Sequence, residues 1–369
     1  MKKVVVFFAF VQAVFGWGSV GHKMINKNAV IHLPVSMQKF INQQSFFEQH
    51  ASDPDSRAPL RQNDTNIYAE YWRHFLDVDD YPNFKNLTRS LDTLISTYGR
   101  ARVREDGTNP WAVVWFMDSL TNQLRRGDWD NAYQTASDIG HYVADPHQPL
   151  HAARNYNGQE TGNNGIHSRY ESNMISNFQN EFTFTKDSVR YISDVFGFAF
   201  HIILESNALK DSVFHADNLA KAQTNGVYNS QYYTIMWQQL GEMTKARFQT
   251  ASIRIASLWY TAWANAGLLE KPMSVRQETA KTEKFFLAQN YPNPFNPASV
   301  ISYKLPAAEK VKLSVFDTAG KEIEILLDSV QSAGNHFVTF NAGQYASGAY
   351  FYRLQVGNSF VTKKMLVQK

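Results

Sequence analysis

Hydrophobic residues recur at helical spacing from about residue 17 to residue 267. Between Trp111 and Arg126, the apolar side chains at 114, 117, 120 and 124 approximate one face of a helix. A second helix is predicted from Asp128 to Asp145, after a turn at Gly127, and a third from Tyr232 to Asn265. Because β-branched runs between tight turns are scarce here, this part of the chain is predicted to be mainly α and multi-helical.

The pattern changes after residue 267. A polar, aperiodic stretch at 268–284 is typical of a linker. From Phe285 onward, apolar and polar residues alternate in short runs such as 311–316 and 350–354, with turn sequences at 318–320, 333–335 and 346–348. We therefore expect a helical domain at 17–267, a linker at 268–284 and a small antiparallel β-sandwich at 285–369.

The first 16 residues have the layout of a secretory signal, with Lys2 and Lys3 followed by an apolar run. Cleavage is expected before Trp17. No other stretch is long and apolar enough to span a bilayer, so the mature chain is expected to be secreted or displayed at the cell surface. The formal charge of +3 falls to +1 without the two lysines, so net charge alone does not favour nucleic acid as a partner.

The chain contains no cysteine, so a transition-metal site must use His, Asp and Glu. His141 and Asp145 are spaced i, i+4, and so are His167 and Glu171. On a helix this spacing places both side chains on one face, where they can bind one metal ion. His151 follows in the loop after Pro149, which should have ended the helix, and it could complete a site. Two such pairs together predict metal binding.

Further ligands are expected from the segments HASDPDSR and EYWRHFLDVDDYP. Asp55 and His74 are the best candidates, and other carboxylates compete for the same roles: Asp53, Asp77, Asp79 and Asp80. Signal cleavage would also expose an amine at Trp17, five residues before His22, and an amine with its neighbouring carbonyl can chelate a metal. A buried aromatic is the ordinary alternative for Trp17. Ordinary core or surface roles are expected for the remaining candidates: His32, His50, His147, His201 and His215.

The motifs WG followed by GH, the Asp in AS-x-x-DS, RHFLD, HYVAD-x-x-x-PLH and HSRYE occur in this order. Together they resemble the superfamily of zinc-dependent phospholipases C and single-strand-specific zinc nucleases, over about residues 17–267. The resemblance implies three zinc ions and a zinc-dependent phosphoric ester hydrolase, in which a zinc-activated water attacks phosphorus. Asp55 could act as a general base, although zinc-activated hydroxide need not require one.

The resemblance also assigns ligands position by position. It implies one zinc bound by Asp55, His74, His141 and Asp145. It implies a second zinc bound by His151, His167 and Glu171. A third would be bound by the amine and carbonyl of Trp17, by His22 and by Asp145, which would bridge two ions.

The substrate is less well defined by these motifs. The ending HSRYE, with Glu171 as the last ligand, is more similar to bacterial phospholipases, whereas the opening WG-x-x-GH is more similar to the nucleases. The nuclease-like Gly-Asn run is reduced to residues 161–165. Four aromatic residues could stack bases or surround a lipid headgroup: Trp72, Phe75, Tyr81 and Tyr156. A phospholipase C-like activity on phospholipid is slightly favoured, with a single-strand-specific endonuclease as the alternative.

The sequence from Phe285 to Lys369 resembles the sorting domains that direct proteins to the type IX secretion machinery. Such a domain is an address and is not expected to contribute to catalysis. A carbohydrate- or protein-binding sandwich is the alternative for this part. For the whole protein, the alternative outside enzymes is a surface binding protein that uses zinc only to stabilise its helices.

Overall fold

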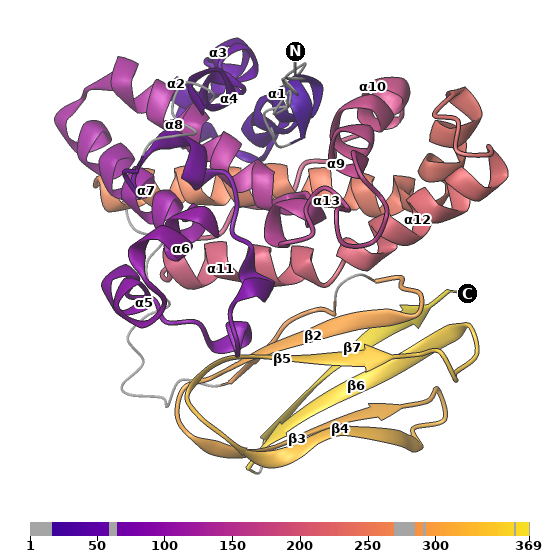
Figure 1. Ribbon diagram of the computed structural model, residues 1–369. Coiled ribbons are helices and arrows are strands. Elements are labelled where there is room, and N and C mark those ends of the chain that lie inside the picture. Colours follow the sequence, from indigo (N-terminus) through magenta and orange to yellow (C-terminus); the bar gives the residue numbers. More distant parts are fainter. Residues whose placement is uncertain (1–16, 59–64, 269–284, 291–292, 358, 369) are drawn as a thin grey trace. The chain divides into compact units, whose positions relative to one another are not determined.

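The protein is described by a computed structural model that covers residues 17–58, 65–268, 285–290, 293–357 and 359–368. The chain forms two compact units, Met1–Pro272 and Met273–Lys369. The first is built of helices and the second of strands, as the hydrophobic pattern predicted (Figure 1). The predicted signal at 1–16 and all of the predicted linker beyond residue 268 lie outside the described residues. None of the helices described in these ranges could cross a membrane.

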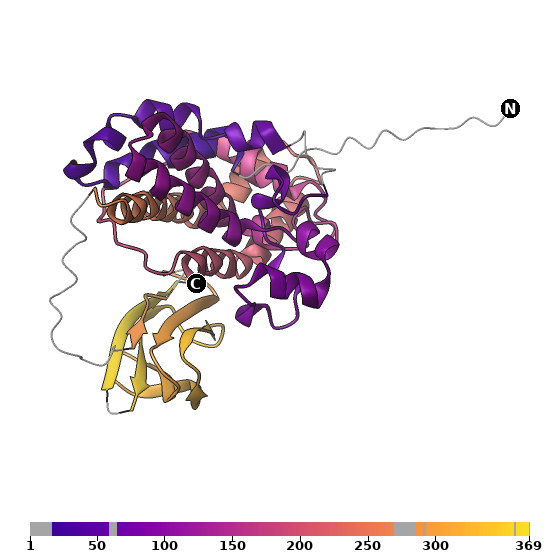
Figure 2. The same ribbon diagram turned by 90° about the vertical axis from the view of Figure 1, so that its left-hand side faces the viewer.

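The helical unit contains three long helices close to those predicted. They are α7 (Asn109–Arg126), α8 (Trp129–Ala144) and α13 (Ser230–Asn265). The shorter helices are α1 (Gly18–Ala29), α2 (Gln38–Ile41), α3 (Gln44–Gln49), α4 (Asp53–Arg57), α5 (Leu91–Tyr98), α6 (Arg100–Glu105), α9 (Ile166–Ser168), α10 (Ile175–Phe178), α11 (Val195–Asn207) and α12 (Lys210–Gln223). One core joins α1, α7, α8, α11, α12 and α13, and α13 runs through the middle of the unit (Figures 1 and 2).

Helices α1 and α8 approach each other closely at Gly140. A Cβ atom at this position would lie only 2.7 Å from Cγ of Asn26, which is fully buried on α1. The amide of Asn26 donates a long hydrogen bond of 3.4 Å to the carbonyl of Ser137. The glycine therefore permits a helix contact one residue before His141 and one helical turn after His22.

Helix α8 ends at Ala144, one residue before its predicted end at Asp145. The reason is Pro146, which has no N–H to donate to the carbonyl of Tyr142 four residues earlier. That carbonyl instead accepts a hydrogen bond of 2.8 Å from the Asn109 side chain. The chain continues through two 3₁₀ turns, η7 (Asp145–His147) and η8 (Pro149–Ala152).

The second unit is a small antiparallel sandwich. One sheet has the strand order β1 (Phe286–Leu287), β2 (Ala298–Leu305), β5 (Gly334–Asn341). The other has the order β4 (Glu322–Gln331), β3 (Glu309–Phe316), β6 (Gly348–Val356), β7 (Ser359–Val367). Apolar residues from both sheets, among them Ile301, Leu313 and Leu354, form one core. The predicted fold class is thus confirmed for both units.

Candidate metal centre

Four side chains from separate elements converge at the end of α8. Asp145 Oδ2 lies 3.0 Å from His74 Nδ1 and 3.2 Å from His141 Nε2. Asp55 Oδ1, from α4, lies 3.2 Å from His141 Nε2 and 3.7 Å from His74 Nδ1. A tetrahedral zinc with ligands at about 2.0–2.1 Å would separate its ligand atoms by about 3.3 Å. The ligand atoms of His74, His141 and Asp145 therefore have the spacing of a zinc site, and Asp55 lies within 3.7 Å of both imidazoles.

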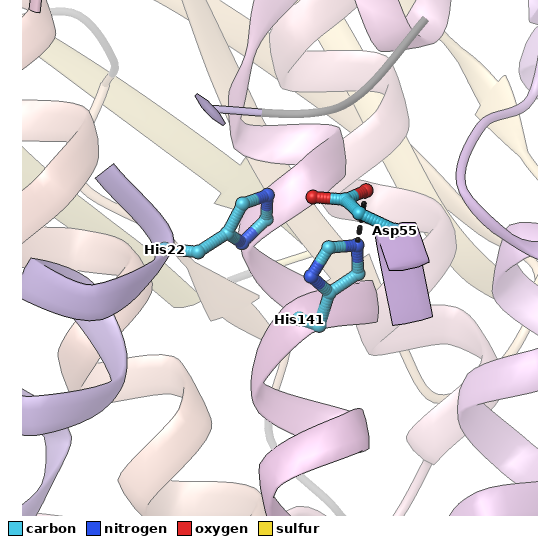
Figure 3. Close-up of side chains that lie close together, drawn as sticks. All are labelled: His22, Asp55 and His141. Carbon is cyan, nitrogen blue, oxygen red and sulfur yellow. Dashed lines mark ion pairs between the residues drawn. The ribbon is translucent and has the colours of Figure 1, made fainter. Parts of the chain in front are cut away.

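The second carboxylate oxygen of Asp145 faces a different partner. Asp145 Oδ1 lies 3.2 Å from Nε2 of His22 on α1. The His22 ring stacks on that of His141, with centroids 3.9 Å apart, and Figure 3 shows both rings and Asp55 pointing toward one another from three helices. Asp145 is thus placed between two groups of nitrogen ligands, as a bridging carboxylate would be.

Trp17 lies at the start of α1. Its indole is fully buried between Tyr170 and Phe248, with ring centroids 5.5 Å and 4.7 Å away. Its carbonyl oxygen accepts a hydrogen bond of 3.2 Å from the Gly21 amide. The aromatic side chain thus has a packing role, and it fixes the position of the backbone just ahead of His22.

A separate group consists of His151, His167 and Glu171. His167 Nε2 lies 2.8 Å from Glu171 Oε2 and 3.1 Å from His151 Nε2. His151 Nε2 and Glu171 Oε2 are 3.7 Å apart. Glu171 belongs to the π-helical segment η9 (Arg169–Met174), which continues directly from α9 and its His167. All three side chains are buried.

Backbone carbonyls orient three of the imidazoles. His141 Nδ1 contacts the carbonyl of Ala51 at 2.8 Å, and His151 Nδ1 contacts that of His74 at 3.0 Å. His167 Nδ1 contacts the Tyr156 carbonyl at 3.0 Å. In each case Nδ1 carries the proton and Nε2 presents its lone pair to the cluster, which is the form that binds a metal. These partners are main-chain atoms, so no residue pattern could have indicated them.

Burial and the neighbouring imidazoles together set the pKa values of the cluster. Burial opposes charge on Asp145, but His141 and the other imidazoles outweigh it and hold the pKa of Asp145 well below its usual range. Burial likewise disfavours charged Asp55, and again the nearby His141 lowers its pKa overall. Burial lowers the pKa of His22, whereas it raises the pKa of Glu171 to about 8.

The residues fit a set of zinc ions by an independent criterion. Among the described residues, three buried atoms that face the cluster have no hydrogen-bond partner: His22 Nε2, Asp55 Oδ1 and Asp145 Oδ1. Unpaired buried polar atoms are costly, and three carboxylates buried together would be more so without cations. Within the described part of the chain, three groups of side chains have ligand atoms close enough to hold a metal: His22, Asp55 and His141; His74, His141 and Asp145; and His151, His167 and Glu171. All of these residues are among the predicted ligands.

Neighbouring candidates are placed elsewhere. Asp53 is half-exposed and contacts His50 Nδ1 at 2.7 Å and the Gln134 amide, so α4 directs Asp55, not Asp53, into the cluster. His147 contacts the Val143 carbonyl at 2.7 Å. Other histidines are also engaged outside the cluster: His32 contacts Ser252, and His201 contacts Glu205.

A pocket of about 140 Å³ opens beside His151 and His167. Its walls include three of the aromatic residues singled out from the sequence, Trp72, Phe75 and Tyr156. The fourth, Tyr81, does not line it and packs against Tyr98 with ring centroids 5.1 Å apart. The other lining residues are Tyr71, Asp77, Glu105 and Leu150. The pocket thus combines aromatic walls with acidic groups beside the cluster.

Comparison with known proteins adds the family. Residues 17–179 match the family model described as S1/P1 Nuclease, and residues 289–368 match that of the Secretion system C-terminal sorting domain. Among solved structures, the alpha-toxin of Clostridium perfringens from avian strain SWCP is 11% identical, with a TM-score of 0.39, covering 96% of this chain and 99% of that one. The alpha toxin of Clostridium absonum is also 11% identical, with a TM-score of 0.38 and the same coverage. The comparison with curated proteins gave no significant match.

The two family matches confirm the resemblance drawn from the motifs. Residues 17–179 of the helical unit are similar to the S1/P1 nucleases, and residues 289–368 of the sandwich match a secretion sorting domain. The protein is therefore a phosphoric ester hydrolase, and it is exported to the cell surface or beyond.

Proposed function

We propose that the protein is an exported zinc phosphodiesterase that cleaves single-stranded nucleic acid. The observation that carries the proposal is the convergence of the predicted side-chain ligands in buried groups, with Asp145 facing His22 on one side and His74 and His141 on the other. The match of residues 17–179 to a nuclease family supports the choice of substrate. The first expectation from the motifs, a phospholipase C, becomes the second candidate.

The geometry and the motifs together support an assignment of ligands to three zinc ions. The first ion is assigned to Asp55, His74, His141 and Asp145. The second is assigned to His151, His167 and Glu171. The third is assigned to His22, to Asp145 through Oδ1, and to the amine and carbonyl of Trp17 after signal removal.

When bound, the zinc ions supply Lewis acidity that activates water for attack on phosphorus and offsets charge on the phosphate. The lowered pKa keeps Asp55 ionised at neutral pH, so its carboxylate can orient a water by accepting its hydrogen bond. The carbonyls of Ala51, His74 and Tyr156 hold the imidazoles in one tautomer. Burial of the cluster strengthens each of these interactions.

The pocket supports a nucleobase as the recognised group. Trp72, Phe75 and Tyr156 offer ring faces on which a base can stack. Burial, reinforced by nearby Asp106, raises the pKa of Asp77 well above its ordinary value. A protonated carboxyl both donates and accepts hydrogen bonds, which suits the edge of a base.

A phospholipid is the second candidate because of two features. Glu171 ends the ligand motif as in bacterial phospholipases, and an ionised Asp77 or Glu105 among aromatic rings would suit a quaternary ammonium headgroup. Charge on Asp77 would run against the direction of its pKa, so this reading relies on Glu105 alone. For that reason nucleic acid is placed first.

Export is proposed to follow the type IX route, with the sorting domain at 285–369 recognised by that machinery. The helical domain is proposed to span 17–267, with a linker at 268–284 and a signal removed before Trp17. The match of residues 289–368 to a sorting-domain family supports this organisation.

The test uses protein with an authentic Trp17 terminus, assayed for bound zinc and for cleavage of single-stranded DNA, RNA and phosphatidylcholine. Asp55→Ala is compared with Asp53→Ala, a matched change two residues away on the same helix whose side chain lies outside the cluster. We expect three zinc ions, cleavage of nucleic acid, and loss of both metal and activity only in Asp55→Ala. His141→Ala should behave like Asp55→Ala.

Each other outcome has a definite meaning. Cleavage of phosphatidylcholine alone would replace the nuclease by the phospholipase. Bound zinc without hydrolysis of any of the three substrates would support a binding protein that zinc stabilises. Full activity of His141→Ala would contradict the metal assignment itself.

A further inference from the structure

The turn between Asp145 and His151 links the parts of the metal centre. Asp145 begins η7 and faces both His22 and the pair His74 and His141, while His151 lies on η8 and belongs to the separate group with His167. The spacing between these groups of ligands therefore depends on how the five residues between them are held.

The turn is held in part by its own hydrogen bonds, from the Gln148 N–H to the Asp145 carbonyl at 2.9 Å and from the His151 N–H to the Gln148 carbonyl at 3.1 Å. Pro146 and Pro149 have no N–H, so two positions of the turn cannot donate hydrogen bonds. Its carbonyls are anchored from outside by Arg247 on α13. Arg247 Nε donates to the carbonyl of His147 at 3.0 Å, and Nη2 donates to that of Pro146 at 3.4 Å. The hydroxyl of Ser206 donates to the Pro146 carbonyl as well.

Arg247 itself is held rigidly and is completely buried. Its Nη1 lies 3.3 Å from Glu205 Oε2, and its Nη2 contacts the Ser206 hydroxyl. Glu205 already has a two-pronged partner, since Arg254 donates to both of its oxygens at 2.6 Å and 2.9 Å. His201 adds a contact of 2.7 Å.

Arg254 already balances the negative charge of Glu205, so this charge does not require Arg247 as a partner. A second buried guanidinium beside one carboxylate carries a desolvation cost, which hydrogen bonds to the turn must offset. The three guanidinium nitrogens of Arg247 point to the turn and to Glu205 from one plane. A lysine side chain cannot reproduce this geometry.

From these contacts we propose that Arg247 is a positioning residue that fixes the distance between the bridging carboxylate Asp145 and the ligand His151. The inference rests on the proposed zinc centre and extends it to a residue that touches neither metal nor substrate. Ser206 assists at the same carbonyl.

The test compares Arg247→Lys and Arg247→Met with wild type and with Arg254→Lys. The control removes a neighbouring guanidinium of the same buried cluster, which contacts Glu205 and the His147 ring at 3.1 Å but, within the described residues, none of the carbonyls of the turn. Zinc is titrated out with a chromophoric chelator, kcat and KM are measured separately, and thermal unfolding is recorded for each variant.

We expect both Arg247 variants to release zinc about 10- to 100-fold more readily than wild type, as is usual when a group that orients ligands is lost. kcat should fall while KM stays within about twofold, because the substrate pocket is untouched. Arg254→Lys should lower the melting temperature without changing zinc release.

Zinc release and kcat equal to wild type in folded Arg247→Met would overturn the inference, as would an equal loss of zinc in Arg254→Lys. If neither Arg247 variant folds, Ser206→Ala tests the inference instead. We expect this variant to lose zinc affinity by a few-fold, and an unchanged zinc affinity would refute the inference. Wild-type protein that binds no zinc would instead refute the proposed function, so the two failures are distinct.

Discussion

The contact between α1 and α8 leads to a prediction for Gly140→Ala. The new Cβ would lie 2.7 Å from Cγ of Asn26, whereas carbon atoms in contact are normally about 3.5–4.0 Å apart. The two helices must therefore separate by about 1 Å, or the buried amide must turn away from its place. Overpacking of this kind costs about 1–3 kcal/mol of folding free energy.

The same movement affects the metal centre. His22 on α1 lies 3.2 Å from Asp145 at the end of α8, close to the separation of about 3.3 Å that a shared zinc requires. A further 1 Å would exceed that separation, so the zinc assigned to His22 should be lost first. We expect purified Gly140→Ala to contain two zinc ions per chain where wild type contains three, by mass spectrometric metal analysis.

The control is the double variant Asn26→Ala with Gly140→Ala. It removes the amide that the new methyl group would strike, at the cost of one weak hydrogen bond to Ser137. The double variant should regain the third zinc, whereas Asn26→Ala alone should retain it throughout. Retention of three zinc ions and full activity by Gly140→Ala would refute the idea that this helix contact sets the position of His22.

Three further predictions concern charge, processing and metal removal. Burial raises the pKa of Asp106 to about 6, so the folded protein holds a proton that the unfolded chain releases near pH 4, and stability falls as pH rises between these values. Asp106→Asn should therefore raise the free energy of unfolding by about 1 kcal/mol at pH 7 and by less at pH 4, measured by urea titration; no gain at pH 7 would contradict this. One methionine added before Trp17 should reduce bound zinc from three ions to two, and unchanged zinc content would exclude the terminal amine as a ligand. Chelation by EDTA should lower the melting temperature by several degrees, because ligands that bind only the folded state stabilise it, and re-addition of zinc should restore it.

Much of the architecture could be predicted from the order of apolar residues. The predicted segment 111–126 corresponds to α7 and 232–265 to α13, because long helices with one buried face leave a clear period in the sequence. The predicted end of the second helix, Asp145, lies one residue beyond Ala144, the last residue of α8. The prediction considered Pro149 and overlooked Pro146, which removes a hydrogen bond within the helix before Pro149 is reached.

The candidate site was predictable where ligands lie four residues apart on one element, as with His141 and Asp145. The choice between Asp53 and Asp55 depended on motif alignment, because the direction of a side chain on a five-residue helix is fixed by tertiary contacts. The carbonyls of Ala51 and Tyr156 were beyond prediction, since any residue supplies a carbonyl. Arg247 was likewise hidden, about 100 residues from the turn it anchors.

The side chains of the metal centre come from segments that are far apart in the chain, from His22 on α1 to Glu171 in η9. No isolated helix carries a complete site, so high metal affinity can arise only after the helices have docked. Loop closure over such separations is slow compared with helix formation. A chain that crosses membranes unfolded would thus be unable to capture zinc tightly on the way, and its hydrolytic activity would begin only where folding is completed.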